Sequence, residues 1–399
     1  MTTSVTKRLL LAVLVLSVVA TIGVSGCKSG GANDTIKIGG TFNLTGNMAS
    51  LDVPASNGAL LAVKEINAAG GVLGKKIDFI LLDGKTDPAT VGNTATQLVN
   101  EKVVAIVGNT DSDSALAVGP IAQAAGIPYI TAGATSPNLP AQVGDMMFLE
   151  PFGDNVQAAA GVEFAVNQLH AKTAYLLYDK GTEYTKLLAK YWKDAFTKAN
   201  GPNSILLEDT FQNRDTDFSA QITRLKALKQ QPDVMLIAVL EATDGGTIAK
   251  QFRDAGINLP IIGGDGWDGP QLIEVGGANT HDVYFTTHAF MSETEGTDKV
   301  KKFWAAYKAE YNKDPESAFA PLGYDAVYLL VDAIKRAGST DGKAIRDALE
   351  KTRGFEGVTG SITYQPGSHI PQKAVTIIAV KDQKYTLGAT VVPQYIPAP

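Results

Sequence analysis

Hydroxyl and carboxylate side chains gather in the segments that follow the expected strands of this chain. Each of these segments is rich in Gly, Ser, Thr or Asp: 41–48, 108–114, 132–137, 179–184, 241–246 and 264–269. Open α/β sheets bind ligands at such strand ends, because helix N-termini offer free N–H groups there. One segment alone would be an ordinary turn with a helix cap. Hydroxyls after two strands of one half of the chain, and carboxylates after two strands of the other half, favour a ligand site.

Two matches to specific binding motifs are not supported by the residues that accompany them. The segment 264–269 fits G-x-G-x-x-G, but Pro270 and a short segment follow it where a dinucleotide site needs a long helix. The residues 109–113 begin like a calcium loop, yet Ser114 and Pro120 stand where that loop requires Gly and Glu. We therefore expect neither a cofactor nor a metal ion.

No catalytic nucleophile stands out. The chain has no G-x-S-x-G elbow, and Ser112 has no histidine near it in the sequence. We expect His170, His281 and His288 at the surface or at a hinge rather than in a catalytic triad. The protein is accordingly predicted not to be an enzyme.

Length, composition and charge narrow the class of protein. A chain of 399 residues suggests two or three domains, and 45% hydrophobic with 19% charged residues suits a folded core. The 35 basic and 41 acidic residues give a formal charge of −6, which argues against a nucleic-acid partner. A single cysteine excludes a disulfide framework and a Cys-rich metal site.

The amino terminus has the pattern of an export signal over residues 1–26. Lys7 and Arg8 precede a mostly apolar run over 9–20. That run would span about 18 Å as a helix, against about 30 Å of membrane hydrocarbon, although extension to Val24 would bring it nearer to a span. We expect cleavage.

The residues Val24–Cys27 resemble the lipobox of bacterial lipoproteins, which implies a diacylglyceryl group on Cys27; an unmodified Cys27 is the alternative. Residues 27–33 would then be a lipidated cysteine and tether. Without Lys7 and Arg8, 33 basic and 41 acidic residues remain, a charge of −8, so no basic patch would assist the anchor. Two acyl chains suffice for stable anchoring. We expect the protein on the outer face of the cytoplasmic membrane, or on the periplasmic side in a two-membrane cell.

Apolar strands alternate with amphipathic helices along the rest of the chain, a pattern that predicts α/β architecture with parallel sheets covered on both faces. The expected strands are Ile36–Phe42, Ile77–Leu82, Val103–Val107, Pro128–Thr131, Ala174–Tyr178, Ser204–Leu207, Val234–Leu240, Ile261–Gly263 and Val283–Thr287. The expected helices are Val53–Ala69, Pro88–Glu101, Ala115–Ala125, Asn155–Leu169, Glu183–Lys198, Phe218–Lys229 and Thr247–Ala255.

Local signals suggest two similarly built lobes. The motif of a helix, Ala-Gly, Pro and a strand occurs at 124–130 and again at 254–262. We place the break near Glu150-Pro151, with Asp154 capping the next helix. The stretch 360–388 has an antiparallel pattern, and we expect it to pack on one parallel sheet rather than extend it.

Several segments in this order resemble type I periplasmic binding proteins, and among them the leucine/isoleucine/valine-binding proteins of ABC importers. They cover most of the chain after the tether: 36–46 (IKIGGTFNLTG), 57–83, 104–139, 217–226 (DFSAQITRLK) and 323–330 (GYDAVYLL).

The resemblance implies two Rossmann-like lobes with parallel sheets, joined by a three-crossover hinge that closes on a solute. Lobe 1 would comprise 34–153 plus 288–366, and lobe 2 would comprise 154–287 plus 367–399. The implied function is capture of an amino acid, branched-chain or related, for an ABC permease and ATPase, by a monomer. The alternatives are another small amide or carboxylate as ligand, or a ligand-sensing receptor lipoprotein of the same fold.

The resemblance also implies roles for residues at matching positions. The hydroxyls of Ser112 and Thr135, with the backbone of Gly133 and Ala134, would bind the carboxylate of an amino acid. Asp265 would take its α-ammonium group. A zwitterion needs such donors and acceptors on opposite sides of a dry cleft, where each hydrogen bond is charge-assisted.

The remaining candidate residues concern the rest of the ligand. Tyr184 matches a tyrosine that lines the second lobe in the family. Leu51, Glu241 and Phe319 stand where relatives often carry aromatic residues, and Asp111 adds an acid beside the candidate site. A Glu241 that faces the ligand would favour a polar, amide or cationic side chain, whereas a Glu241 turned to solvent would leave an aliphatic pocket.

Overall fold

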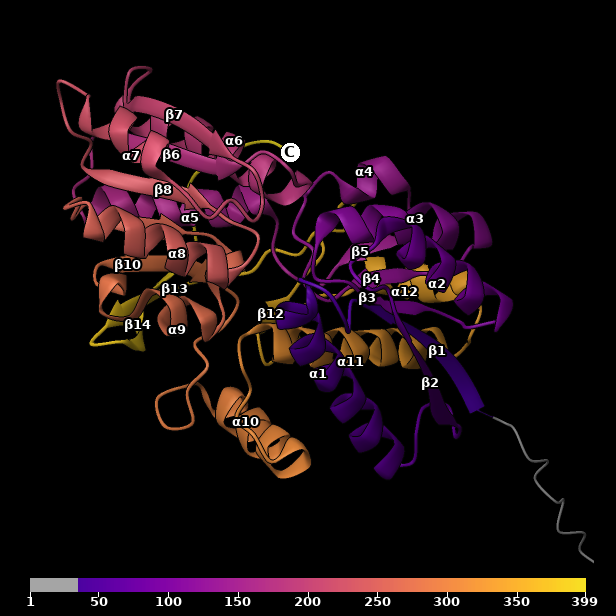
Figure 1. Ribbon diagram of the computed structural model, residues 1–399. Helices are drawn as coiled ribbons and strands as arrows, with labels where there is room; N and C mark the ends of the chain where they lie inside the picture. The colour runs from indigo at the N-terminus through magenta and orange to yellow at the C-terminus, as the bar shows by residue number, and fades with distance from the viewer. Residues whose placement is uncertain (1–34) are drawn as a thin grey trace, which may run out of the picture. The chain divides into compact units, whose positions relative to one another are not determined.

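The computed structural model of the protein describes residues 35–399. The predicted signal peptide (1–26) and the predicted lipidated cysteine and tether (27–33) lie outside the described residues. Residues 35–399 fold as one unit with two lobes, and each lobe is built on its own large sheet (Figure 1). The prediction of α/β architecture is confirmed.

The first lobe contains a five-stranded sheet in which every strand is parallel to its neighbours, in the order β2-β1-β3-β4-β5. Its strands are β1 (Thr35–Phe42), β2 (Lys76–Asp83), β3 (Ile106–Gly108), β4 (Tyr129–Thr131) and β5 (Met147–Leu149). Its helices are α1 (Ala49–Ala68), α2 (Pro88–Asn100), α3 (Ser112–Ala125), α4 (Leu139–Val143), α11 (Phe319–Ala337) and α12 (Gly342–Glu350). Buried aliphatic residues of α1, α11 and the sheet form a continuous core.

The second lobe contains a seven-stranded sheet in the order β14-β13-β10-β9-β8-β6-β7. Its strands are β6 (Ala174–Asp179), β7 (Ile205–Phe211), β8 (Val234–Ala238), β9 (Ile261–Gly263), β10 (Val283–Thr287), β13 (Val375–Lys381) and β14 (Lys384–Val391). Its helices are α5 (Asp154–Asn167), α6 (Glu183–Asn200), α7 (Ser219–Lys226), α8 (Ala242–Asp254) and α9 (Gln271–Gly276). The remaining elements are α10 (Asp298–Tyr311) and the paired strands β11 (Phe355–Gly357) and β12 (Gly360–Ile362).

The structure corrects the expectation for the stretch 360–388. Its strand β13 extends the parallel sheet, because it pairs antiparallel with β10 and places Tyr284 opposite Ala379. The outer edge of β10 offers N–H and C=O groups that an antiparallel strand satisfies as well as a parallel one. Figure 1 shows β13 and β14, in yellow, beside β10.

The helix ends agree with the local signals in most places. Asp87 caps α2 by accepting a hydrogen bond from the Thr90 N–H at 2.7 Å, and Gly126 ends α3 at a φ of 66°. The prediction for Asp154 is wrong, since Gly153 holds the N-cap position of α5. The Asp154 carboxylate instead accepts a hydrogen bond from the Gln157 side-chain amide at 2.9 Å.

The chain passes between the two sheets after β5, after β10 and after β12, and a buried ion pair joins the first and the third passage. Lys373 Nζ lies 2.8 Å from Glu150 Oε1 and 2.7 Å from Thr359 Oγ1, and the Thr359 hydroxyl in turn donates to Asp325 at 2.7 Å. Burial raises the pKa of Glu150 to about 7 although the charge of Lys373 opposes that shift. The hinge therefore encloses two carboxylates and one ammonium group.

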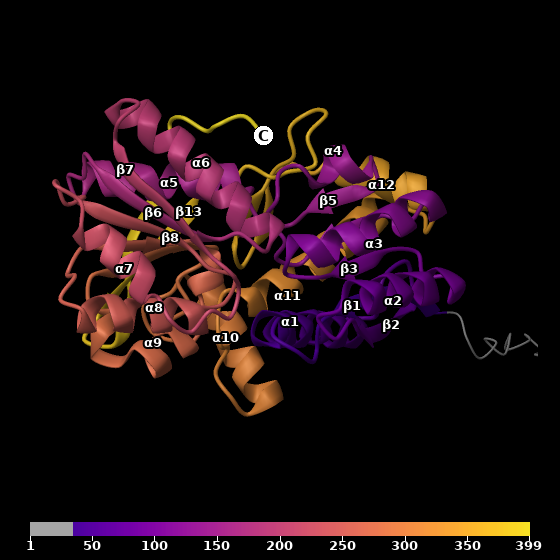
Figure 2. The ribbon, with the colours of Figure 1, turned by 45° about the horizontal axis from the view of Figure 1, so that its top comes forward.

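Helices α1 and α11 lie side by side in both views of the ribbon (Figure 1, Figure 2). Two glycines permit this close approach. A Cβ atom on Gly58 would collide with the Ala320 carbonyl oxygen, and one on Gly323 would collide with the carbonyl oxygen of Ala55. Backbone atoms cannot move aside as a flexible side chain can, so each glycine sets the distance between the helices.

We therefore predict that Gly58→Ala lowers the free energy of unfolding by about 1–3 kcal/mol, as overpacking of a close helix contact does. Urea denaturation measures the effect. Gly92→Ala, in the interior of α2, is the matched control: its new Cβ would meet no atom closer than 3.8 Å. Helix propensity should make that variant more stable by up to about 1 kcal/mol. Equal effects of the two substitutions would contradict the close-contact explanation.

Candidate functional site

A small cavity lies between the lobes, at the carboxyl ends of strands from both sheets. Its lining residues from the first lobe are Met48, Leu51, Thr110, Asp111, Ser112, Thr135 and Phe319, and those from the second lobe are Tyr184, Leu240, Asp265 and Gly266. The cavity holds about 10 Å³, which is room for about one water molecule. A larger solute therefore enters only when the lobes move apart.

The first lobe contributes hydroxyl groups from two strand ends. Ser112 begins α3, directly after β3, and its Oγ accepts a hydrogen bond from the Ser136 N–H at 3.3 Å. The hydroxyl hydrogen of Ser112 is then free to be donated. Thr135 follows β4 and is 2% exposed. Its carbonyl oxygen accepts from the Asp154 N–H at 2.8 Å, which fixes the turn that carries it.

The second lobe contributes a buried carboxylate. Asp265 stands in a short 3-10 helix, Asp265–Trp267, directly after β9, and is 2% exposed. Its Oδ1 accepts from the Gln157 side-chain amide at 2.9 Å, and its Oδ2 lies 3.1 Å from His288 Nε2. A carboxylate has about four lone-pair sites. Asp265 thus retains acceptor capacity.

Tyr184 stands beside this carboxylate, in the first turn of α6. Its hydroxyl oxygen accepts a hydrogen bond from the Gly266 N–H at 3.1 Å. Burial, followed by the charges of Asp265 and Asp154, raises the pKa of Tyr184 well above its usual value. Tyr184 is therefore a neutral phenol, and its hydroxyl group donates a hydrogen bond to the Asp265 carboxylate.

Six of the nine predicted ligand-binding residues line the cavity, and Gly133, Ala134 and Glu241 do not. Gly133 packs behind Phe319, where a Cβ atom would lie 2.9 Å from the ring. Ala134 is buried, and its carbonyl oxygen accepts from the Thr131 hydroxyl at 3.1 Å.

Glu241 holds the N-cap position of α8 and makes a side-chain hydrogen bond with Asn47 of the other lobe. Burial and the nearby charge of Asp244 raise its pKa to about 7. The carboxyl group therefore neither lines the cavity nor points fully into solvent.

The structure also places residues that sequence reasoning missed. Met48, Thr110, Leu240 and Gly266 line the cavity, and Gln157 holds Asp265 from α5. The first four lie within or next to the strand-end segments, so their positions in the sequence could have identified them as candidate site residues. Gln157 lies in the first turn of α5, and nothing in its sequence surroundings distinguishes it. His288 is the one of the three histidines named above that is buried, whereas His170 and His281 are exposed.

Buried carboxylates make the surroundings of the cavity strongly acidic. Burial raises the pKa of Asp111 to about 6 and that of Asp268 to about 6. Burial, with a neighbouring acid, raises the pKa of Asp52 and of Asp154 well above the usual range. Burial therefore disfavours the charged form of each of these four acids.

Within residues 35–399, no group of three or more His, Cys, Asp and Glu side chains is arranged to hold a metal ion. In the same residues, no helix combines the length and apolar character that a membrane span requires.

Two α/β lobes that enclose donors on one side and a carboxylate on the other define a protein that captures a solute by closing around it. The chain belongs to the periplasmic binding protein family, whose model matches residues 35–384.

Individual relatives agree with this assignment. Leu/Ile/Val-binding protein homolog 3 of Brucella melitensis is 30% identical over 92% of this chain and 97% of its own length. The branched-chain amino acid transporter substrate binding protein LivJ of Streptococcus pneumoniae, solved with isoleucine, is 34% identical. It covers 91% of this chain and 100% of its own, with a TM-score of 0.80. A solute binding protein of an ABC transporter from Rhodopseudomonas palustris BisB5, solved with 3,4-dihydroxybenzoic acid, is 26% identical. It covers 92% of this chain and 99% of its own, with a TM-score of 0.79.

We predict that the free energy of unfolding of the Asp111→Asn variant increases relative to that of wild type as the pH rises. Folding raises the pKa of Asp111 from 3.8 to about 6. The stability that the protonated Asp111 adds to the folded state is therefore fully present below pH 3.8 and is lost as the pH rises past 6. Asparagine resembles the protonated acid and can keep the helix cap. Between pH 4.5 and pH 8, the difference in unfolding free energy should move by about 1–3 kcal/mol in favour of the variant. Urea denaturation at both values measures it.

Asp87→Asn is the control, because Asp87 caps α2 in the same way but is exposed. Its hydrogen bonds with Thr90 lower its pKa, so that variant should lose stability relative to wild type as the pH rises. A difference for Asp111→Asn that stays constant with pH would contradict the prediction.

Proposed function

We propose that the protein captures an amino acid, branched-chain or related, and delivers it to the permease of an ABC importer. The observation that carries this proposal is the buried Asp265 carboxylate, which lines one cavity together with Ser112 and Thr135. Hydroxyl donors suit the carboxylate of the solute, and Asp265 suits its α-ammonium group. Contact of the Gly133 and Ala134 backbone with the solute carboxylate stays a prediction.

The walls of the cavity support an aliphatic side chain on the solute. Met48, Leu51, Leu240 and Phe319 line it, and Glu241 is held at its rim by Asn47. The names of the Brucella and Streptococcus relatives point the same way. The Rhodopseudomonas relative favours a second candidate, a carboxylate that lacks an amine. The charge of Asp265 distinguishes the two, since an amine-free acid leaves that carboxylate buried without a cation.

The other parts of the proposal concern the whole protein. We propose that it acts as a monomer, catalyses no reaction, and divides into lobes at 34–153 plus 288–366 and 154–287 plus 367–399. We propose further that removal of residues 1–26 exposes Cys27, which carries the lipid anchor outside the cytoplasmic membrane.

Asp265→Ala should weaken leucine binding by roughly 30-fold to several-thousand-fold, which corresponds to about 2–5 kcal/mol, because a buried ammonium group loses its partner. Asp265→Asn should recover only part of the loss. Calorimetry on the folded variants measures both. An affinity within about threefold of wild type, less than about 0.7 kcal/mol, would count against the ammonium site and against an amino acid ligand.

Cys27→Ala should move the protein from the membrane fraction to the soluble fraction, or leave it unprocessed, because no other cysteine can carry the acyl chains. Fractionation and intact mass of the full chain, expressed with its own leader, check this. An unchanged membrane fraction and an unchanged mass would remove the lipoprotein proposal.

A further inference from the structure

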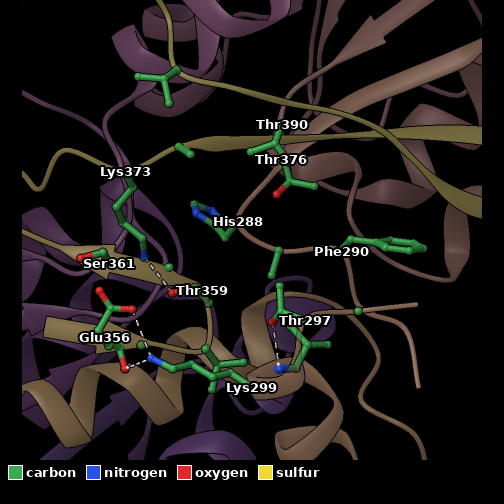
Figure 3. Close-up of a pocket in the computed structure, with 18 of the residues that line it drawn as sticks. His288, Phe290, Thr297, Lys299, Glu356, Thr359, Ser361, Lys373, Thr376 and Thr390 are labelled. Carbon is green, nitrogen blue, oxygen red and sulfur yellow. Dashed lines mark hydrogen bonds and ion pairs between the residues drawn. The ribbon is translucent and has the colours of Figure 1, made fainter. Parts of the chain in front are cut away.

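His288 connects the candidate ligand site to the hinge. It follows β10 directly, where the chain leaves the second sheet, and is 2% exposed. Its Nε2 lies 3.1 Å from Asp265 Oδ2, and its ring stacks on Phe152 with centroids 4.1 Å apart. Figure 3 shows His288 on the wall of a second cavity, near Lys373 and Thr376.

The protonation of His288 follows from its surroundings. Burial lowers its pKa, and the charge of Lys373 lowers it further, although the hydrogen bond with Asp265 opposes both. A neutral imidazole carries one hydrogen, and Asp265 can accept it only from Nε2. The other ring nitrogen, Nδ1, is buried and has no hydrogen-bond partner, which fits a bare lone pair.

Gln157 holds the other oxygen of the Asp265 carboxylate through a hydrogen bond from its side-chain amide. Its amide nitrogen donates to Asp265 Oδ1 and to Asp154 Oδ1, each at 2.9 Å. Its amide oxygen accepts from the Asp265 N–H at 3.2 Å and from the Thr286 hydroxyl at 2.7 Å. Every hydrogen-bonding position of the Gln157 amide is therefore used, which gives the side chain one orientation.

Gln157 and His288 are thus neutral donors, and so is the Tyr184 phenol, whose side chain also hydrogen-bonds Asp265. A lysine or arginine in their place would neutralise the carboxylate and remove its attraction for a second cation. Neutral donors fix the position of the carboxylate and leave its negative charge for a ligand.

We propose that His288 is a positioning residue that makes the site selective for ligands with an ammonium group, by holding Asp265 Oδ2 without neutralising it. This inference rests on the proposed function, since it assigns the Asp265 carboxylate to the solute ammonium group. It adds a determinant outside the candidate ligand cavity, because His288 does not line that cavity.

The test compares leucine with 2-hydroxy-4-methylpentanoate, which has a neutral hydroxyl in place of the ammonium group. His288→Leu removes the donor and should weaken leucine binding about tenfold, but should weaken the hydroxy acid by less than about threefold. His288→Gln places an amide nitrogen near the position of Nε2 and should keep both affinities within about threefold of wild type. Calorimetry on the purified protein measures all of these affinities.

His369→Leu is the matched control. His369 is also buried and stacked, on Phe148 at a centroid distance of 3.9 Å, but its Nδ1 lies 2.9 Å from the Met147 carbonyl oxygen and it has no contact with Asp265. That variant should bind both ligands like wild type. If His288→Leu does not fold, His288→Gln is compared with His288→Asn, whose shorter amide cannot reach Asp265 and should weaken leucine binding selectively.

Equal weakening of both ligands by His288→Leu, or no change for either ligand, would overturn the inference. The same holds if the glutamine variant is as impaired as the leucine variant. The Asp265→Ala variant keeps this failure separate from that of the proposed function. Leucine binding that survives Asp265→Ala contradicts the ammonium site itself. Leucine binding that is lost in Asp265→Ala but unaffected in His288→Leu overturns the positioning role alone.

Discussion

The Asp265 carboxylate is buried where the two lobes meet, and the groups that hold it carry no charge. Removal of an ion from water is costly unless another charge or several hydrogen bonds replace the lost hydration. Gln157 and His288 supply part of that replacement at 2.9 and 3.1 Å. The Tyr184 side chain also hydrogen-bonds Asp265, and in the proposed function the ammonium group of the solute supplies the rest. The same constraint accounts for the tight cavity, since water that entered freely would hydrate the carboxylate and weaken its attraction for a ligand.

The buried acids at the hinge, unlike Asp265, lie in a network with a positively charged side chain. Glu150 and Asp325 are as buried as Asp265, but the network that contains them includes Lys373 and Thr359. Lys373 Nζ lies 2.8 Å from Glu150 Oε1 and supplies one positive charge to this pair of acids. The buried acids at the hinge thus lie beside a resident cation, whereas the proposed function leaves Asp265 for the cation of a ligand. His288 interacts with the surroundings of both sets of acids: it is hydrogen-bonded to Asp265, and the charge of Lys373 lowers its pKa.

Much of this arrangement could be predicted from the sequence, because it depends on local patterns. Apolar runs located the strands, and the Asp87 cap and the Gly126 stop located helix ends. Ser112, Thr135 and Asp265 lie in the strand-end segments, and the family resemblance implied their individual roles. What could not be predicted comes from contacts between distant segments: Gln157 reaches Asp265 across 108 positions, and Glu241 turns toward Asn47 of the other lobe. The antiparallel addition of β13 was missed for the same reason, since the free edge of β10 exists only in the assembled sheet.

The pairing of early and late segments also sets the order in which the chain can fold. Helix α1 packs against α11, and β10 receives β13 from the last part of the chain. A chain that emerges amino terminus first therefore has an incomplete first lobe until α11 follows, and an unpaired strand edge until β13 follows. Contacts so far apart in sequence form slowly, because the intervening loop must close first. A family member that has to cross a membrane as an extended chain gains time from that delay, since neither lobe can complete its core before nearly all of the polypeptide is present.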